Sequence, residues 1–219
     1  MTWVKICGMT NLEDALVAVE AGADAVGFVF YEKSPRCVSV ETAREIVAKL
    51  PPEVEKVGVF VSENVSQPVE VLERTGLTTA QVYSNSIHEW MPWYQNGERR
   101  LMWAIPGSAL KEEFLISLGT VDKPISALVV DSGSGDRPGG TGERFDWEGA
   151  KIGIRFVEQH VPVVVAGGLS PQNVDHAIKT LRPWGVDVAS GVEAAPGRKD
   201  PEKVRAFVRA VREMDRRVG

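Results

Sequence analysis

The sequence of 219 residues is poor in the residues on which disulfide and zinc chemistry depend. It contains two cysteines, Cys7 and Cys37, and three histidines. Two cysteines are too few for a disulfide framework, and with so few histidines no spacing typical of a zinc site occurs. The composition therefore argues against zinc chemistry and against mechanisms built on histidine pairs, and it favours a reducing compartment.

Long apolar runs and an excess of positive charge are missing as well. No segment approaches the roughly 20 apolar residues that cross a bilayer, and the N-terminus has no basic stretch followed by an apolar core. Lys and Arg number 25 against 30 Asp and Glu, a net charge of −5, whereas nucleic acids and anionic lipids require a basic surface. We therefore expect a cytoplasmic protein, a monomer or a homodimer, whose partner is a small molecule and neither nucleic acid nor membrane.

What the sequence does contain is a regular alternation of short apolar runs and amphipathic segments. Apolar runs too short for helices are typical of parallel strands that are covered on both faces. The expected strands cover residues 3–6, 25–30, 57–61, 80–83, 101–104, 127–130, 161–166 and 186–189. Helical patterns lie between them, and two helices are expected to begin at Ser170-Pro171 and at Asp200-Pro201.

Eight strands that alternate with about eight helices indicate right-handed βαβ units and a parallel sheet. Two architectures fit this pattern, an open doubly wound sheet and a closed (β/α)8 barrel. No low-complexity linker or block of charge divides the chain, so we predict an α/β protein in which residues 1–219 form a single-domain (β/α)8 TIM barrel. The active site of such a barrel lies at the C-terminal ends of its strands, which makes each strand end informative.

Three strand ends carry side chains suited to acid–base or ion-pair chemistry. Cys7 ends the first strand, where the charge of Lys5 would lower the pKa of the thiol, although a lone cysteine packs as often as it reacts. Arg36 follows the second strand, and its guanidinium suits a planar carboxylate, although most loop arginines are merely solvated. Asp131 follows four apolar strand residues, where burial would keep the carboxyl protonated and able to donate a proton, the alternative being a helix cap.

Glycines follow the last three strands. A glycine-rich loop at residues 132–142 has the composition of a lid, and it lacks the Gly-Lys-Ser/Thr ending of a nucleotide-triphosphate loop. Gly167 and Gly168 follow the seventh strand, and Ser190 and Gly191 follow the eighth. Because glycines let backbone N–H groups approach a phosphate closely, these two loops together predict a phosphorylated substrate.

Five segments, in order along the chain, contain these strand ends and loops. They are Lys-Ile-Cys-Gly-Met-Thr at 5–10, Gly-Phe-Val-Phe at 27–30 with Ser-Pro-Arg at 34–36, Val-Asp-Ser at 130–132 with Gly-Gly-Thr-Gly at 139–142 and Phe-Asp-Trp at 145–147, Ala-Gly-Gly-Leu-Ser-Pro-Gln-Asn-Val at 166–174, and Gly-Val-Asp-Val-Ala-Ser-Gly-Val-Glu at 185–193. In composition and order these segments resemble the phosphoribosylanthranilate isomerase family, and the resemblance extends over residues 5–200.

The resemblance implies a (β/α)8 barrel that catalyses an Amadori rearrangement in tryptophan biosynthesis. In that reaction N-(5-phosphoribosyl)anthranilate, an aldosylamine, becomes a 1-deoxyribulose 5-phosphate derivative. The resemblance places the family's general base on Cys7, its general acid on Asp131 and its anthranilate-binding arginine on Arg36. It also implies an intramolecular oxidoreductase of the aldose–ketose type, which works by acid–base catalysis without a cofactor or a metal.

Substrate contacts are expected beyond these three residues. The expected positions are Gln81, Gly140, Gly167, Gly168, Ser190 and Gly191. The sequence departs from the family at the end of the fourth strand, where the common Gln-Leu-His-Gly is replaced by Gln-Val-Tyr-Ser at 81–84. The role of that histidine does not transfer to Tyr83, which could donate a hydrogen bond or stack on the substrate's aromatic ring.

Two other functions are compatible with the same barrel. A lyase such as the neighbouring indole-glycerol-phosphate enzyme would need lysine and glutamate at strand ends, and beyond Lys5 the strands offer little of that chemistry. A catalytically silent or altered-specificity sugar-phosphate binder would be expected to have lost Cys7 or Asp131, and both are present. The isomerase is therefore the leading hypothesis.

Overall fold

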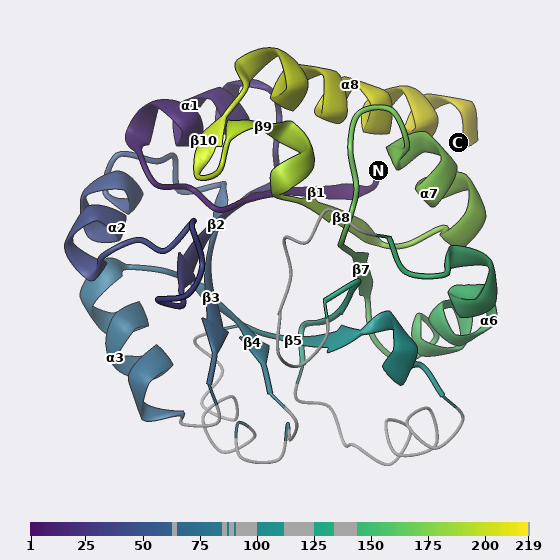
Figure 1. Cartoon of the computed structure of the whole chain (residues 1–219), viewed down its shortest axis with the longest axis horizontal. Coiled ribbons are helices and arrows are strands. Elements are labelled where there is room, and N and C mark those ends of the chain that lie inside the picture. The colour runs from purple at the N-terminus through teal and green to yellow at the C-terminus, as the bar shows by residue number, and fades with distance from the viewer. Residues whose placement is uncertain are drawn as a thin grey trace.

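Eight parallel strands form a closed barrel in the order β1-β2-β3-β4-β5-β6-β7-β8 (Figure 1). The computed structural model describes residues 1–62, 65–84, 87, 90, 100–111, 125–133 and 144–218. The strands are β1 (Trp3–Cys7), β2 (Ala25–Phe30), β3 (Glu55–Val61), β4 (Thr79–Tyr83), β5 (Arg100–Pro106), β6 (Ala127–Asp131), β7 (Val163–Val165) and β8 (Gly185–Val188). Pairing of β1 with β8, with Lys5 opposite Asp187, closes the ring and confirms the predicted barrel.

Helices surround the barrel (Figure 1). In the described ranges the α-helices are α1 (Leu12–Glu20), α2 (Val40–Val47), α3 (Ser66–Thr75), α6 (Trp147–Val157), α7 (Val174–Leu181) and α8 (Pro201–Val218). Short 3-10 helices η2 (Gly107–Ala109) and η3 (Ser190–Val192) follow β5 and β8. The helices expected between β4 and β6 fall in segments that lie mostly outside the described residues.

The seventh helix begins later than the sequence predicted. Pro171 was expected in its first turn, but α7 starts at Val174. The reason is that Asn173 holds the preceding turn: its Oδ1 accepts the Ser170 N–H at 2.8 Å, and its Nδ2 donates to the Gly168 carbonyl at 2.9 Å. The prediction for the last helix is confirmed, since α8 begins at Pro201. A hairpin of β9 (Glu193–Ala195) and β10 (Arg198–Lys199) was not anticipated.

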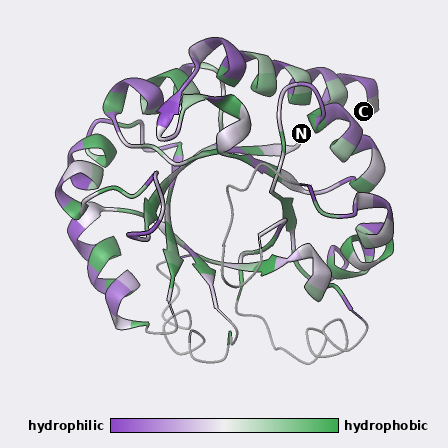
Figure 2. Cartoon of the chain, in the orientation of Figure 1, coloured by the Kyte–Doolittle hydropathy of each residue, from purple (hydrophilic) through white to green (hydrophobic). Residues whose placement is uncertain are grey.

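In the described part of the chain, hydrophobic residues form two buried clusters, because alternate residues of a strand point to opposite faces. The larger cluster joins strands to helices, as where Val4 and Ile6 of β1 meet the helical layer. The smaller cluster lies inside the barrel and contains Met102, Ala104, Ala127, Val129, Val164 and Ala166. Figure 2 shows the strands largely hydrophobic, whereas the helices alternate hydrophobic and hydrophilic residues. No helix of the described chain is long and apolar enough to span a membrane.

Candidate active site

A pocket lies at the carboxyl ends of the barrel strands, where the sequence analysis expected an active site. Seven of the predicted site residues line it, namely Cys7, Arg36, Gln81, Asp131, Gly167, Gly168 and Ser190. Gly191 lines an adjoining open pocket, and Gly140 lies outside the described residues. Strand alternation explains the arrangement, since Cys7 follows Lys5 by two residues and Asp131 follows Val129 by two, so each points into the barrel.

Cys7 lies beside a buried ion pair. Lys5 Nζ is 2.7 Å from Asp187 Oδ2, and the charge of the Lys5 ammonium also acts on the Cys7 side chain. Burial raises the pKa of the Cys7 thiol and the charge of Asp187 adds to this, while Lys5 and Lys199 oppose it. The prediction that positive charge lowers the pKa of Cys7 below its ordinary value is therefore wrong, because burial outweighs the neighbouring ammonium groups.

The ammonium of Lys5 nevertheless stays charged. Its side chain is fully buried, which by itself lowers the pKa, but Asp187 and Cys7 outweigh burial and the pKa of Lys5 is raised. For Asp187, burial raises the pKa of the carboxyl against the opposing charge of Lys5. A positive charge is thus fixed next to the Cys7 sulfur.

Asp131 ends β6 with 3 % of its surface exposed, and both of its oxygens accept hydrogen bonds. The Tyr83 hydroxyl donates to Oδ2 at 2.6 Å. The Gly133 N–H and the Ser132 hydroxyl donate to Oδ1 at 3.2 and 3.3 Å. Burial raises the pKa of Tyr83 well above its ordinary value and the charge of Asp131 adds to this, so the phenol remains a donor. The predicted acid is therefore buried, with its carboxyl plane fixed from two sides.

Arg36 is held by a glutamate that the sequence analysis did not single out. Its Nε and Nη2 each donate to a different carboxylate oxygen of Glu193 at 2.8 Å, and Lys199 Nζ lies 3.0 Å from Glu193 Oε1. Burial raises the pKa of Glu193, but Arg36 and Lys199 outweigh it, so the pKa is lowered. The Nη1 group of Arg36 has no partner among the described residues and can bind a further carboxylate.

Two buried acceptors in the pocket have no hydrogen-bond partner in the described part of the chain. They are Gln81 Oε1 and Asp187 Oδ1. A buried polar atom without a partner costs free energy, so such atoms in a pocket indicate where a ligand donates hydrogen bonds. For Gln81 this agrees with the predicted substrate contact.

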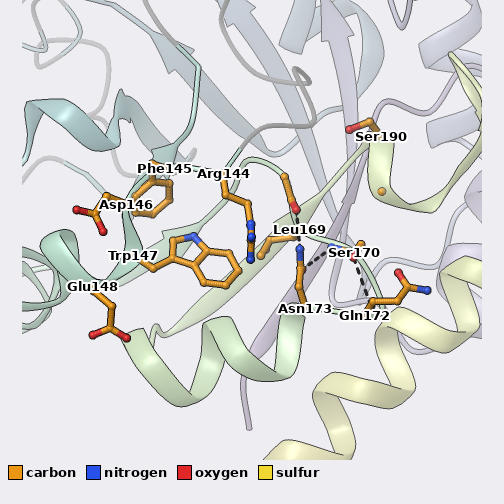
Figure 3. A pocket seen from close by; sticks show the side chains of 12 residues that line it. Arg144, Phe145, Asp146, Trp147, Glu148, Leu169, Ser170, Gln172, Asn173 and Ser190 are labelled. Atoms are coloured by element: carbon orange, nitrogen blue, oxygen red, sulfur yellow. Dashed lines mark hydrogen bonds between the residues drawn. The ribbon is translucent and has the colours of Figure 1, made fainter.

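The glycine loops after β7 and β8 pack tightly against their neighbours. Gly167 and Gly168 have positive φ angles of 79° and 64°, which favour glycine. A Cβ on Gly191 would lie 1.9 Å from the Leu169 carbonyl oxygen, so only glycine fits there. The adjoining pocket runs from these loops to α6, where the guanidinium of Arg144 lies 5.1 Å over the Trp147 ring (Figure 3). Figure 3 also shows Asn173 bonded to the Gly168–Ser170 turn, so the loop carrying Gly168 is held in one conformation.

The pocket thus combines a buried thiol, a buried carboxyl, an arginine with free donors and two glycine loops. Val29 of β2, its register partner Val59 of β3, and Val61 also line the pocket and form an apolar wall. Acid and base groups on different strands of one pocket can move protons at two atoms of a bound ligand. In the described residues no group of three or more His, Cys, Asp or Glu is placed to hold a metal ion.

Comparison with known proteins gives a consistent result. The family model for N-(5'-phosphoribosyl)anthranilate (PRA) isomerase matches residues 4–210. The N-(5'-phosphoribosyl)anthranilate isomerase of Citrifermentans bemidjiense is 46 % identical over 209 residues, which are 95 % of this chain and 96 % of the relative. A crystal structure of phosphoribosyl anthranilate isomerase from Thermotoga maritima matches with a TM-score of 0.83 at 37 % identity, covering 97 % of this chain and 100 % of that one. Another phosphoribosyl anthranilate isomerase, in complex with reduced 1-(o-carboxyphenylamino)-1-deoxyribulose 5-phosphate, matches with a TM-score of 0.80, also at 37 % identity, 97 % and 100 % being covered.

Proposed function

The chain belongs to the N-(5'-phosphoribosyl)anthranilate isomerase family, and from that premise we propose which of its residues carry out the reaction. The protein is an isomerase of tryptophan biosynthesis that converts N-(5-phosphoribosyl)anthranilate by an Amadori rearrangement. We assign the general base to Cys7 and the general acid to Asp131. The observation that carries this assignment is that the two buried groups, on β1 and β6, line one pocket at the mouth of the barrel.

The pocket's chemistry orients the substrate. The phosphate binds at the glycine loops, through backbone N–H groups near Gly168, Ser190 and Gly191, and the family resemblance adds Gly140. The anthranilate carboxylate binds the free donors of Arg36, and its ring lies against the valine wall. Gln81 Oε1, which lacks a partner among the described residues, accepts a hydrogen bond from the substrate between these two ends.

The reaction begins when Asp131 donates its proton to the furanose ring oxygen. The bond between C1' and that oxygen breaks, and the nitrogen lone pair forms a C1'=N iminium. The Cys7 thiolate then removes the proton from C2', and the electron pair of that bond neutralises the iminium to give an enolamine. Ketonisation follows, in which C1' gains a proton and the C2' hydroxyl loses one, so that the product is an isomer of the substrate.

The substrate's own nitrogen stores the electron pair in this sequence, so acid–base catalysis suffices without a cofactor. The net change oxidises C2' and reduces C1', which makes the reaction an aldose–ketose type of intramolecular oxidoreduction. Burial keeps most of the Cys7 thiol protonated in the free enzyme, since its pKa is raised above the ordinary value. The thiolate that acts is stabilised by the charged Lys5 ammonium beside it.

We also propose that residues 1–219 form one domain of a cytoplasmic protein, a monomer or a homodimer, whose ligand is a phosphorylated small molecule. The parallel pairing of β1 with β8 supports a single domain, because the barrel is closed by its first and last strands. The net charge of −5 supports the absence of a nucleic-acid partner. Sedimentation velocity with and without inorganic phosphate measures the oligomeric state.

The assignment is tested with phosphoribosylanthranilate made in situ, by following the loss of its fluorescence. Wild type is compared with Cys7→Ser and Asp131→Asn. Each catalytic group contributes about 10²- to 10⁴-fold, so both variants should lose at least that much kcat while retaining a folded barrel by circular dichroism. A variant that keeps wild-type kcat shows that its residue is not part of the mechanism. A wild-type protein that binds the substrate without turning it over supports the alternative hypothesis of a catalytically silent sugar-phosphate binder.

A further inference from the structure

Tyr83 stands where this chain departs from its family, and it contacts the general acid directly. Its hydroxyl donates to Asp131 Oδ2 at 2.6 Å, whereas the bonds to Oδ1 measure 3.2 and 3.3 Å. A short O–H···O bond is a strong one, and it becomes charge-assisted once the carboxyl has given up its proton. The phenol is therefore the firmest hydrogen-bond contact of the acid in the described structure.

The contact spans two strands of the barrel. Tyr83 on β4 pairs in register with Ala104 on β5, and Ala104 pairs with Val129 on β6. Asp131 lies two residues beyond Val129 on the same inward face. Because Ala104 carries only a methyl group, the long phenol side chain reaches across β5 to the carboxyl. A small residue on the intervening strand thus makes room for the bond.

We propose that Tyr83 is a positioning residue for proton transfer by Asp131. The Tyr83 hydroxyl holds the Asp131 carboxyl in one orientation and stabilises the carboxylate that remains once the proton has left. The proposal rests on the assignment of Asp131 as the general acid. A hydrogen bond that strengthens as negative charge develops lowers the barrier to the chemical step and leaves substrate binding largely unaffected.

The surroundings of the phenol keep it a donor. The titratable groups that face it are Asp131 on β6, Asp187 on β8 and Cys7 on β1, with the ammonium of Lys5 behind Cys7. Burial raises the pKa of Tyr83 and the acidic neighbours add to this, so the phenol stays protonated wherever the enzyme is assayed. Stacking on the substrate's ring, the other role considered for this residue, needs the ring and not the hydroxyl.

Removing only the hydroxyl separates these roles. Tyr83→Phe keeps the ring and loses the donor, so kcat should fall by about 10- to 100-fold while KM changes by less than about threefold. Tyr83→His, which restores the residue common in the family, should recover part of that kcat because an imidazole N–H can donate to the same carboxylate. An unchanged kcat in Tyr83→Phe, or a rise in KM alone, overturns the proposal in favour of stacking or packing.

A double-mutant cycle distinguishes action through Asp131 from a general loosening of the barrel. In the Asp131→Asn background, assayed at high enzyme concentration, Tyr83→Phe should cost less than about twofold more, because the group it serves is gone. If the two fold-losses in kcat multiply in the double variant, the proposal is contradicted. If the double variant is too slow to measure, the kcat of Tyr83→Phe and its rescue in Tyr83→His decide. Should Asp131→Asn itself retain full turnover, it is the assignment of the acid that fails.

Discussion

Replacing Gly191 with alanine tests whether the loop after β8 binds the phosphate. An ideal Cβ at this position lies 1.9 Å from the Leu169 carbonyl oxygen and 3.1 Å from the Ser170 Cα, both backbone atoms that no rotamer change can move. Ordinary contacts begin at 3.4 Å, so the two loops must separate by about 1.5 Å. A displacement of about 1 Å in a positioning group costs about 10²-fold in rate, and we expect a loss of this size in kcat/KM.

The assay compares kcat/KM on the phosphorylated substrate with competitive inhibition by inorganic phosphate. Both should weaken together in Gly191→Ala, because both depend on the same backbone N–H groups. The matched control is Gly153→Ala on α6, where the new Cβ would lie 3.4 Å from Leu110 Cβ, an ordinary contact. Its kinetics should equal those of wild type. A folded Gly191→Ala variant with undiminished phosphate inhibition would refute the placement of the phosphate.

Two further variants test the buried charges. In Lys5→Met the Lys5 ammonium no longer opposes the effect of burial on Cys7, so the pKa of the thiol should rise further above its ordinary value. The pKa is measured as the midpoint of the pH dependence of alkylation by iodoacetamide, in a Cys37→Ser background. An unchanged midpoint contradicts the interaction between Lys5 and Cys7. The same variant leaves the buried carboxylate of Asp187 without its cation, so its free energy of unfolding, measured in urea, should fall by about 3–5 kcal/mol. Glu193→Gln should raise KM, since Arg36 loses a bidentate partner, and should be less stable than wild type at pH 7 by about 1–3 kcal/mol. The pKa of Glu193 is lowered in the folded state, so the difference in unfolding free energy between wild type and variant is present above the ordinary glutamate pKa and disappears as the pH falls through the lowered value. A difference that persists at low pH counts against the ion pair.

The fold was accessible from sequence because its signal is local. Each of the eight apolar runs became a strand, and Pro201 starts the last helix as expected. The late start of α7 was not accessible, since it depends on Asn173 bonding to the backbone of an adjacent turn. The proline can be read from the sequence, whereas the competing hydrogen bonds exist only in the folded chain.

The candidate site was predicted as a list of residues, and its pairings were not. Cys7, Arg36 and Asp131 were selected because their residue types at strand ends suit particular chemistry. Glu193 beside Arg36, Tyr83 beside Asp131 and the Lys5 partner Asp187 lie far away in the sequence, so no spacing connects these pairs. The error over the pKa of Cys7 has the same origin, because charge can be counted from a sequence, whereas the extent of burial depends on the closed barrel.

The ion pair between Lys5 and Asp187 has a consequence for how the protein is made. The two residues lie 182 positions apart, on the first and last strands of the ring. During synthesis Lys5 and Cys7 leave the ribosome early, and the carboxylate that pairs with Lys5 follows only after most of the chain has been translated. Contacts of such separation carry a large loop-closure entropy and slow folding. Because the pocket combines residues of β1 and β8, enzymatic activity should appear on refolding only after the ring has closed, and its time course reports that event.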